Sequence, residues 1–171
     1  MVFPDNWKKI LCHEVVFYQK LTTADKSRFS NEVMRFLANV KITGIQTNID
    51  IKDKLLVASS AVIPVFGFPG WEYTFLDEVL IYPTSFDRNF NIGSHKEVIT
   101  GMVGSGAMEG KMILARNALH SGFNNPRDKK NVGVHEFMHL IDKEDGVIDG
   151  VPNSLNDKPA GIFSCCRRIF F

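Results

Sequence analysis

The sequence His-Glu-x-x-His at residues 135–139 constrains this chain more than any other feature. In a helix, residues four positions apart lie on the same face, so His135 and His139 can present two imidazoles to one metal ion. Glu136 follows His135 directly, and its carboxylate can take a proton from a metal-bound water. The pattern therefore predicts two zinc ligands and a general base, the arrangement of zinc peptidases.

The residues around this motif favour a helix with two different sides. Apolar residues recur at helical spacing on one side: Val134, Phe137, Met138 and Ile141. On another side, His135, His139 and Asp142 follow one another at positions i, i+4 and i+7. The motif thus lies in a context that suits a metal site, and the alternative is an amphipathic helix whose histidines lie at the surface.

The composition is that of an ordinary globular protein. With 171 residues, of which 44% are hydrophobic and 23% charged, we expect residues 1–171 to form a single domain. The formal net charge of +1 gives no basic surface for direct contact with nucleic acid. No run of charges indicates binding to a membrane surface, and no apolar run approaches the roughly 18 residues of a membrane-spanning helix.

The cysteines Cys12, Cys165 and Cys166 argue against a disulfide framework. Their number is odd, two are adjacent, and no Cys-x-x-Cys occurs, which also argues against a cysteine-type zinc site. A reducing compartment fits this pattern best. The N-terminal residues lack the basic and apolar regions of a secretory signal. We therefore expect the protein to be cytoplasmic.

Hydrophobic periodicity predicts an α+β fold with a small mixed sheet packed on helices. Helices are expected at residues 6–20, about 24–39, 50–61 and 117–122, and from Lys129 or Lys130 to Glu144 or Asp145. Strands are expected at residues 41–48, 73–82, 97–103 and 111–115. Thr23 can cap the second helix, and Pro64 is expected to end or kink the third. His13 and His120 lie outside the motif and are expected to be surface or structural residues.

One of these strands is a candidate for substrate binding. In zinc peptidases, a strand beside the metal helix commonly holds an extended peptide by strand addition. Residues 111–115 are the candidate for such an edge strand, and an internal strand is the alternative.

Four segments of the chain form a recognisable set. They are residues 17–21 (Phe-Tyr-Gln-Lys-Leu), 28–37, 79–83 (Val-Leu-Ile-Tyr-Pro) with Phe86, and 135–142, followed by Gly146 and residues 149–152. This set resembles the Mlc titration factor A family of zinc peptidases, over the chain up to about Ala160. The segment that begins at His135 is the longest match.

The resemblance implies a cytosolic zinc metallopeptidase with a zincin-like, specifically gluzincin-like, core in which the His-Glu-x-x-His helix is central. It also implies aminopeptidase-type cleavage of short peptides and binding of Mlc, a transcriptional repressor of glucose-uptake genes. By position, His135 and His139 match the zinc ligands and Glu136 matches the catalytic base. Asp142 has no such match, and we expect it either to orient a zinc-bound histidine through a hydrogen bond or to serve as a substitute ligand.

The chain departs from this family where the third zinc ligand is expected. In the family that ligand is a glutamate several tens of residues downstream, but the only glutamate after Glu136 is Glu144. We therefore expect the chain to lack the family's C-terminal part. Asp145 is a substitute candidate because it occupies the last position of a metzincin-type motif, although Asp142 stands where that motif needs glycine. Two further candidates without a supporting motif are Asp149 and Asp157.

Two hypotheses of different kinds follow. The first is a zinc metallopeptidase that hydrolyses peptide bonds with a zinc-activated water. The second is a catalytically inactive binding protein, or a truncated remnant, on the same scaffold, because catalytic zinc normally has three protein ligands and a water. Zinc content and peptide turnover distinguish the two.

Overall fold

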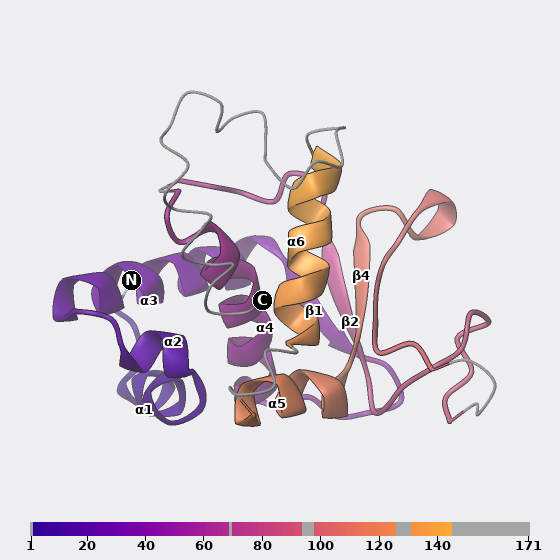
Figure 1. Cartoon of the computed structure of the whole chain (residues 1–171), viewed down its shortest axis with the longest axis horizontal. Coiled ribbons are helices and arrows are strands. Elements are labelled where there is room, and N and C mark those ends of the chain that lie inside the picture. The colour runs from indigo at the N-terminus through magenta and orange to yellow at the C-terminus, as the bar shows by residue number, and fades with distance from the viewer. Residues whose placement is uncertain (1, 69, 94–97, 126–130, 145–171) are drawn as a thin grey trace.

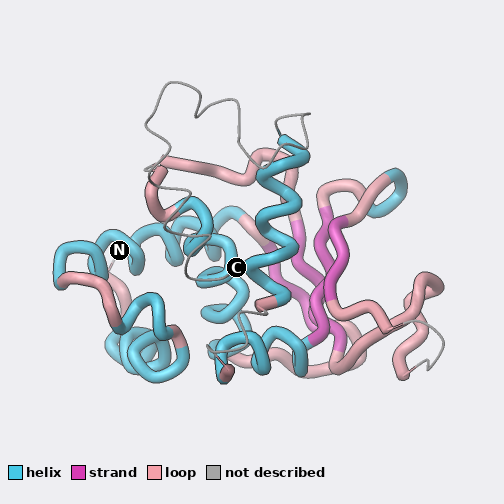
Figure 2. Tube along the Cα trace, in the orientation of Figure 1, coloured by secondary structure: helices cyan, strands magenta, loops and turns pink. Residues whose placement is uncertain are grey.

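The structure, a computed structural model, describes residues 2–68, 70–93, 98–125 and 131–144 (Figure 1). Within these residues the α-helices are α1 (Asp5–Glu14), α2 (Val16–Gln19), α3 (Thr23–Asn39), α4 (Ile51–Val65), α5 (Arg116–Asn124) and α6 (Val132–Glu144). The strands are β1 (Lys41–Gly44), β2 (Glu78–Tyr82), β3 (Gly101–Val103) and β4 (Lys111–Ala115), and a short 3-10 turn spans Gly106–Met108. The predicted small mixed sheet packed on helices is confirmed (Figure 2).

The sheet has the strand order β1-β2-β4-β3. β1, β2 and β4 are parallel, whereas β3 runs antiparallel to β4 with Met102 opposite Ile113. β4 is therefore an internal strand, and the proposal that residues 111–115 form the edge is wrong. The edge strands are β1 and β3, and β3 is the edge that packs against α6, because the chain turns back after Val103 and pairs with the strand that follows.

The most enclosed helix is α4, in which every residue from Leu55 to Val65 is buried. It begins with a capping box, in which the Asp50 carboxylate accepts from the Asp53 N–H and the Asp53 carboxylate accepts from the Asp50 N–H. The helix continues past Ala61 and ends at Val65, one residue after Pro64. Burial of the apolar residues before Pro64 extends the helix beyond the predicted bound at residue 61, and it ends next to Pro64 as expected.

Several predicted boundaries differ from the structure for local reasons. The helix predicted at residues 6–20 is two helices, because buried Val15 adopts an extended backbone between α1 and α2. Thr22, and not Thr23, caps α3, with its side chain accepting from the Asp25 N–H at 3.2 Å. The strands predicted at residues 73–82 and 97–103 are confined to β2 and β3.

The motif helix α6 packs against α4 and α5, and also against β3 and β4 (Figure 1). It begins at Val132, where the Asn131 side chain accepts from the Val134 N–H at 3.0 Å. Gly133 permits the crossing with α4, because a Cβ at this position would lie 2.2 Å from Ser60 Oγ. A residue without a side chain is thus needed where the two helices touch.

Two further expectations concern the cysteines and membranes. Cys12 is a free, exposed cysteine, and Cys165 and Cys166 lie outside the described residues. Among the helices that the structure describes, none has the length and apolar character needed to cross a membrane.

Candidate metal centre

The two histidines of the motif lie side by side on the exposed face of α6. His135 Nε2 is 3.0 Å from His139 Nε2, and the ring centroids are 4.4 Å apart with an interplanar angle of 80°. Two nitrogen ligands of a tetrahedral zinc ion, each about 2.0–2.1 Å from the metal, would lie roughly 3.3 Å apart. The two imidazoles are therefore arranged almost as two ligands of one zinc ion would be.

The protonation of His135 also suits metal binding. Burial lowers the pKa of His135, and the neighbouring His139 lowers it further. A lowered pKa favours the neutral imidazole, which is the form that binds a metal.

Glu136, in contrast, points into the protein and is only 8% exposed. Burial raises the pKa of its carboxyl, and His139 opposes this effect without cancelling it. The side chain lies against Gly101 of β3. The candidate base is thus enclosed between α6 and the edge strand, one residue away from the first histidine.

Gly101 is a part of this site that the sequence analysis missed. A Cβ built on Gly101 would lie 2.6 Å from Glu136 Cγ and 2.7 Å from Glu136 Oε1, closer than real carbon atoms approach. The sequence did contain an indication of this contact, because a glycine inside a predicted strand often marks the close approach of another group. Gly101 therefore makes room for the Glu136 carboxyl at the sheet edge.

We expect Gly101→Ala to lower peptide hydrolysis by about 100-fold, since displacing a reacting group by an ångström can cost that much. Zinc content should stay at the wild-type level, because the nearest neighbours of the added methyl group belong to Glu136 and Val132 and not to a histidine. The measurement is a rate assay beside elemental analysis of zinc. Met102→Leu, a change of similar volume on the other face of the same strand, is the control. An unchanged rate in Gly101→Ala would show that the Glu136 position is not critical.

A third metal ligand is not found among the described residues. No group of three or more His, Cys, Asp or Glu side chains that could hold a metal occurs there, so Asp142 does not complete a site with His135 and His139. Asp142 is half-buried on α6, and its expected role as an orienting residue stays a prediction. The substitute candidates Asp145, Asp149 and Asp157 lie outside the described residues.

His13 and His120 have the expected structural or surface positions. His120 Nε2 lies 2.6 Å from the Asp53 carboxylate, which is fully buried and also accepts from Arg116 Nε at 2.9 Å. His13 is exposed and pairs with Glu14 at 3.1 Å. Neither residue contributes to the candidate metal centre.

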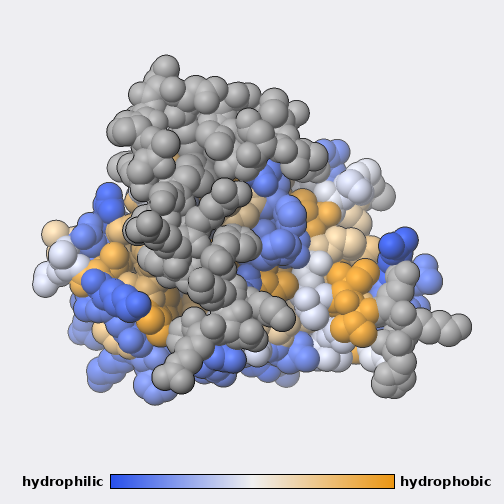
Figure 3. Space-filling model, viewed as in Figure 1, coloured by the Kyte–Doolittle hydropathy of each residue, from blue (hydrophilic) through white to orange (hydrophobic). Residues whose placement is uncertain are grey.

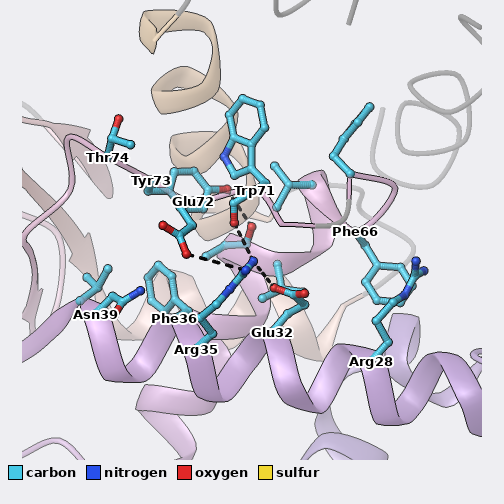
Figure 4. A pocket seen from close by; sticks show the side chains of 15 residues that line it. Arg28, Glu32, Arg35, Phe36, Asn39, Phe66, Trp71, Glu72, Tyr73 and Thr74 are labelled. Atoms are coloured by element: carbon cyan, nitrogen blue, oxygen red, sulfur yellow. Dashed lines mark hydrogen bonds and ion pairs between the residues drawn. The ribbon is translucent and has the colours of Figure 1, made fainter. Parts of the chain in front are cut away.

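A separate hollow lies between α3 and residues 66–74, and neither motif histidine lines it (Figure 4). Arg35 pairs there with Glu32, donates to the Trp71 carbonyl at 2.8 Å and lies 3.7 Å from Glu72. The Arg28 guanidinium stacks on a phenylalanine ring of the same hollow at 4.0 Å. Because no residue of the motif lines this hollow, it has no part in the candidate metal centre.

Comparison with known proteins identifies the family of this chain. Residues 1–164 match the family described as glucose-regulated metallo-peptidase M90. An uncharacterised protein of Synechocystis sp., slr2042, is 26% identical over 157 residues, which cover 87% of this chain and 56% of that protein. The chain thus spans little more than half the length of the curated relative it matches. A metallopeptidase family implies a divalent metal, typically zinc, and two facing imidazoles suit that ion. The resemblance to the Mlc titration factor A peptidases is confirmed, and the chain belongs to the glucose-regulated metallo-peptidase M90 family.

Proposed function

We propose that this chain is a zinc-dependent peptidase with a zincin-like, more narrowly gluzincin-like, core, in which α6 provides two zinc ligands and the general base. The observation that most supports this function is the pair of imidazole nitrogens 3.0 Å apart on the helix that also bears buried Glu136. An antiparallel edge strand beside this helix is compatible with such a core.

The residues of α6 would have separate roles in the reaction. His135 and His139 would hold zinc, which lowers the pKa of a bound water towards about 7 and polarises a carbonyl. Glu136 would accept the proton of the attacking water and deliver it to the leaving amine. Its raised pKa suits both steps, because a catalytic base works best when its pKa approaches the working pH.

The outer edge of β3 is a candidate for binding the peptide backbone. The Ala115 N–H donates to the Thr100 carbonyl and the Gly104 N–H donates to the Lys111 carbonyl, each at 2.8 Å. Because bonding alternates along an antiparallel pair, Gly101 and Val103 direct their N–H and C=O groups away from β4. Just before β3, Ile99 bonds to Phe86 on that side, and no other described strand pairs with β3 itself there. An extended peptide could therefore add there, next to Glu136.

A catalytically inactive binding protein is the second candidate function. The observation that favours it is the absence of a third zinc ligand among the described residues, because two histidines alone make a weak catalytic site. Binding of the Mlc repressor, aminopeptidase-type cleavage and a cytoplasmic location belong to the same proposal as family expectations. Of these three expectations, only the cleavage depends on which of the two functions is correct.

Zinc content tests the metal site directly. We expect about one zinc per chain in purified, dialysed protein and a large loss of zinc in His139→Ala. The measurement is elemental analysis without added metal. His13→Ala is the matched control, because His13 is exposed and contacts only Glu14 among the contacts described for its ring. Zinc near zero in the wild-type chain would favour the inactive binding protein, and equal zinc in His139→Ala would place the metal elsewhere.

A further inference from the structure

A pocket next to the metal helix contains a large aromatic side chain that the fold leaves exposed. Phe75, Val103 and Leu140 line it, together with residues of the turn before β4: Gly104, Glu109, Gly110 and Lys111. The side chain of Phe75 is 66% exposed, although it precedes β2 closely. The cavity volume is about 210 Å³, whereas an apolar cavity of about 150 Å³ accommodates a benzene ring. The pocket therefore has room for a leucine or phenylalanine side chain.

The pocket shares both the strand β3 and the helix α6 with the contact between Glu136 and Gly101. Glu136 lies against Gly101, whereas Leu140, one helical turn further along α6, lines the pocket with Val103. Four residues of helix advance by about 6 Å and two residues of strand by about 6.6 Å. The distance along α6 from Glu136 to Leu140 is therefore nearly the same as the distance along β3 from Gly101 to Val103. Figure 3 shows hydrophobic surface on the sheet side of the hydrophilic outer face of α6.

We propose that this pocket selects an apolar side chain of an extended peptide whose backbone pairs with the outer edge of β3. The inference rests on the proposed function, since it assigns a preference to the same peptide-binding edge. Side chains of an extended strand that are two residues apart lie on the same face. The selected side chain is thus about two residues from the peptide bond held beside Glu136. Phe75, Val103 and Leu140 are the apolar side chains that line it.

A binding experiment tests the pocket without requiring turnover. Two fluorescein-labelled hexapeptides are used, identical except for one internal position that is leucine or alanine. Their Kd values for Glu136→Gln protein are measured by fluorescence anisotropy, and the same pair is measured with Phe75→Ala added. We expect the leucine peptide to bind about tenfold more tightly, because its side chain leaves water on binding. Phe75→Ala should remove most of this difference and leave binding of the alanine peptide nearly unchanged.

Val98→Ala is the matched control, because Val98 is 67% exposed and does not line the pocket. It should preserve the leucine preference. Equal Kd values for the two peptides, no binding of either, or a preference that survives Phe75→Ala would overturn the proposal. The proposed hydrolysis is tested separately: a preference for leucine that persists in His135→Ala protein supports the pocket even if no peptide is cleaved. If peptide is cleaved but Phe75→Ala does not change the preference for leucine, the pocket proposal is contradicted and the proposed peptidase function still stands.

Discussion

Glu136→Gln is expected to lower peptide hydrolysis by about 10²–10⁴-fold, the contribution of a well-placed general base. Glutamine has nearly the shape of glutamate, so it should still fit between α6 and Gly101, but its amide cannot accept the proton of the attacking water. His135 and His139 are unchanged, so zinc content should remain at the wild-type level. The measurement is the initial rate of peptide cleavage beside elemental analysis of the same samples.

The matched control for this substitution is Glu32→Gln, which makes the same chemical change on α3, where Glu32 pairs with Arg35. It should leave the rate unchanged. A rate that survives in Glu136→Gln would contradict the proposed role of Glu136 as the base. A zinc-loaded wild-type chain that cleaves no peptide would instead favour the inactive binding protein.

Asp53→Ala should lower the free energy of unfolding by about 2–3 kcal/mol, because it removes a buried carboxylate that caps α4 and accepts a charged hydrogen bond from the partly exposed Arg116. The Asp53 carboxylate is fully buried and accepts hydrogen bonds from Arg116 Nε at 2.9 Å and from the Asp50 N–H at 2.8 Å. His120 Nε2 lies 2.6 Å from the same carboxylate. These contacts join the start of α4 to α5, so their loss weakens both the helix cap and the packing between helices.

Urea unfolding at neutral pH measures this effect. Glu72→Ala is the control, because it removes an exposed carboxylate that lies 3.7 Å from Arg35, and such surface pairs contribute less than about 1 kcal/mol. If both variants lose the same small amount of stability, the Asp53 cluster does not hold α4 and α5 together.

The same carboxylate predicts how stability changes in acid. Burial alone would raise the pKa of Asp53, but hydrogen bonds from Arg116, the Asp50 N–H and His120 outweigh it and lower the pKa. The folded-state pKa is therefore below the unfolded value of about 3.9. The stabilisation by the ionised Asp53 carboxylate is fully present above the unfolded-state pKa and is lost as the pH falls through the folded-state pKa. The stability difference between wild type and Asp53→Ala should accordingly shrink in acid, and a constant difference would show that charge is not its cause.

Local geometry explains what could be predicted from the sequence. The pairing of His135 with His139 was predictable because residues at i and i+4 always share a helix face, whatever surrounds the helix. The strand at residues 111–115 was predicted with its observed bounds, because a short apolar run suits a buried strand. The small mixed sheet on helices followed from the succession of such segments.

Contacts between distant residues could not be predicted in this way. Arg116 and His120 follow Asp53 by 63 and 67 residues, and no periodicity relates them. The order β1-β2-β4-β3, which makes β3 the edge instead of β4, depends on how the chain turns after Val103. The break at Val15 likewise depends on burial of that side chain among helices that are far apart in sequence.

The sequence by itself determined the family, the motif helix and the two imidazoles that face one another, because each depends on residue order over a few helical turns or on a match along the chain. Only the tertiary structure decided that Glu136 is buried against Gly101, that β3 offers its outer edge beside it, and that Phe75 and Leu140 form a pocket one helical turn away. Those relations arise when α6 packs across the sheet edge, and packing between distant segments is not encoded in the spacing of neighbouring residues.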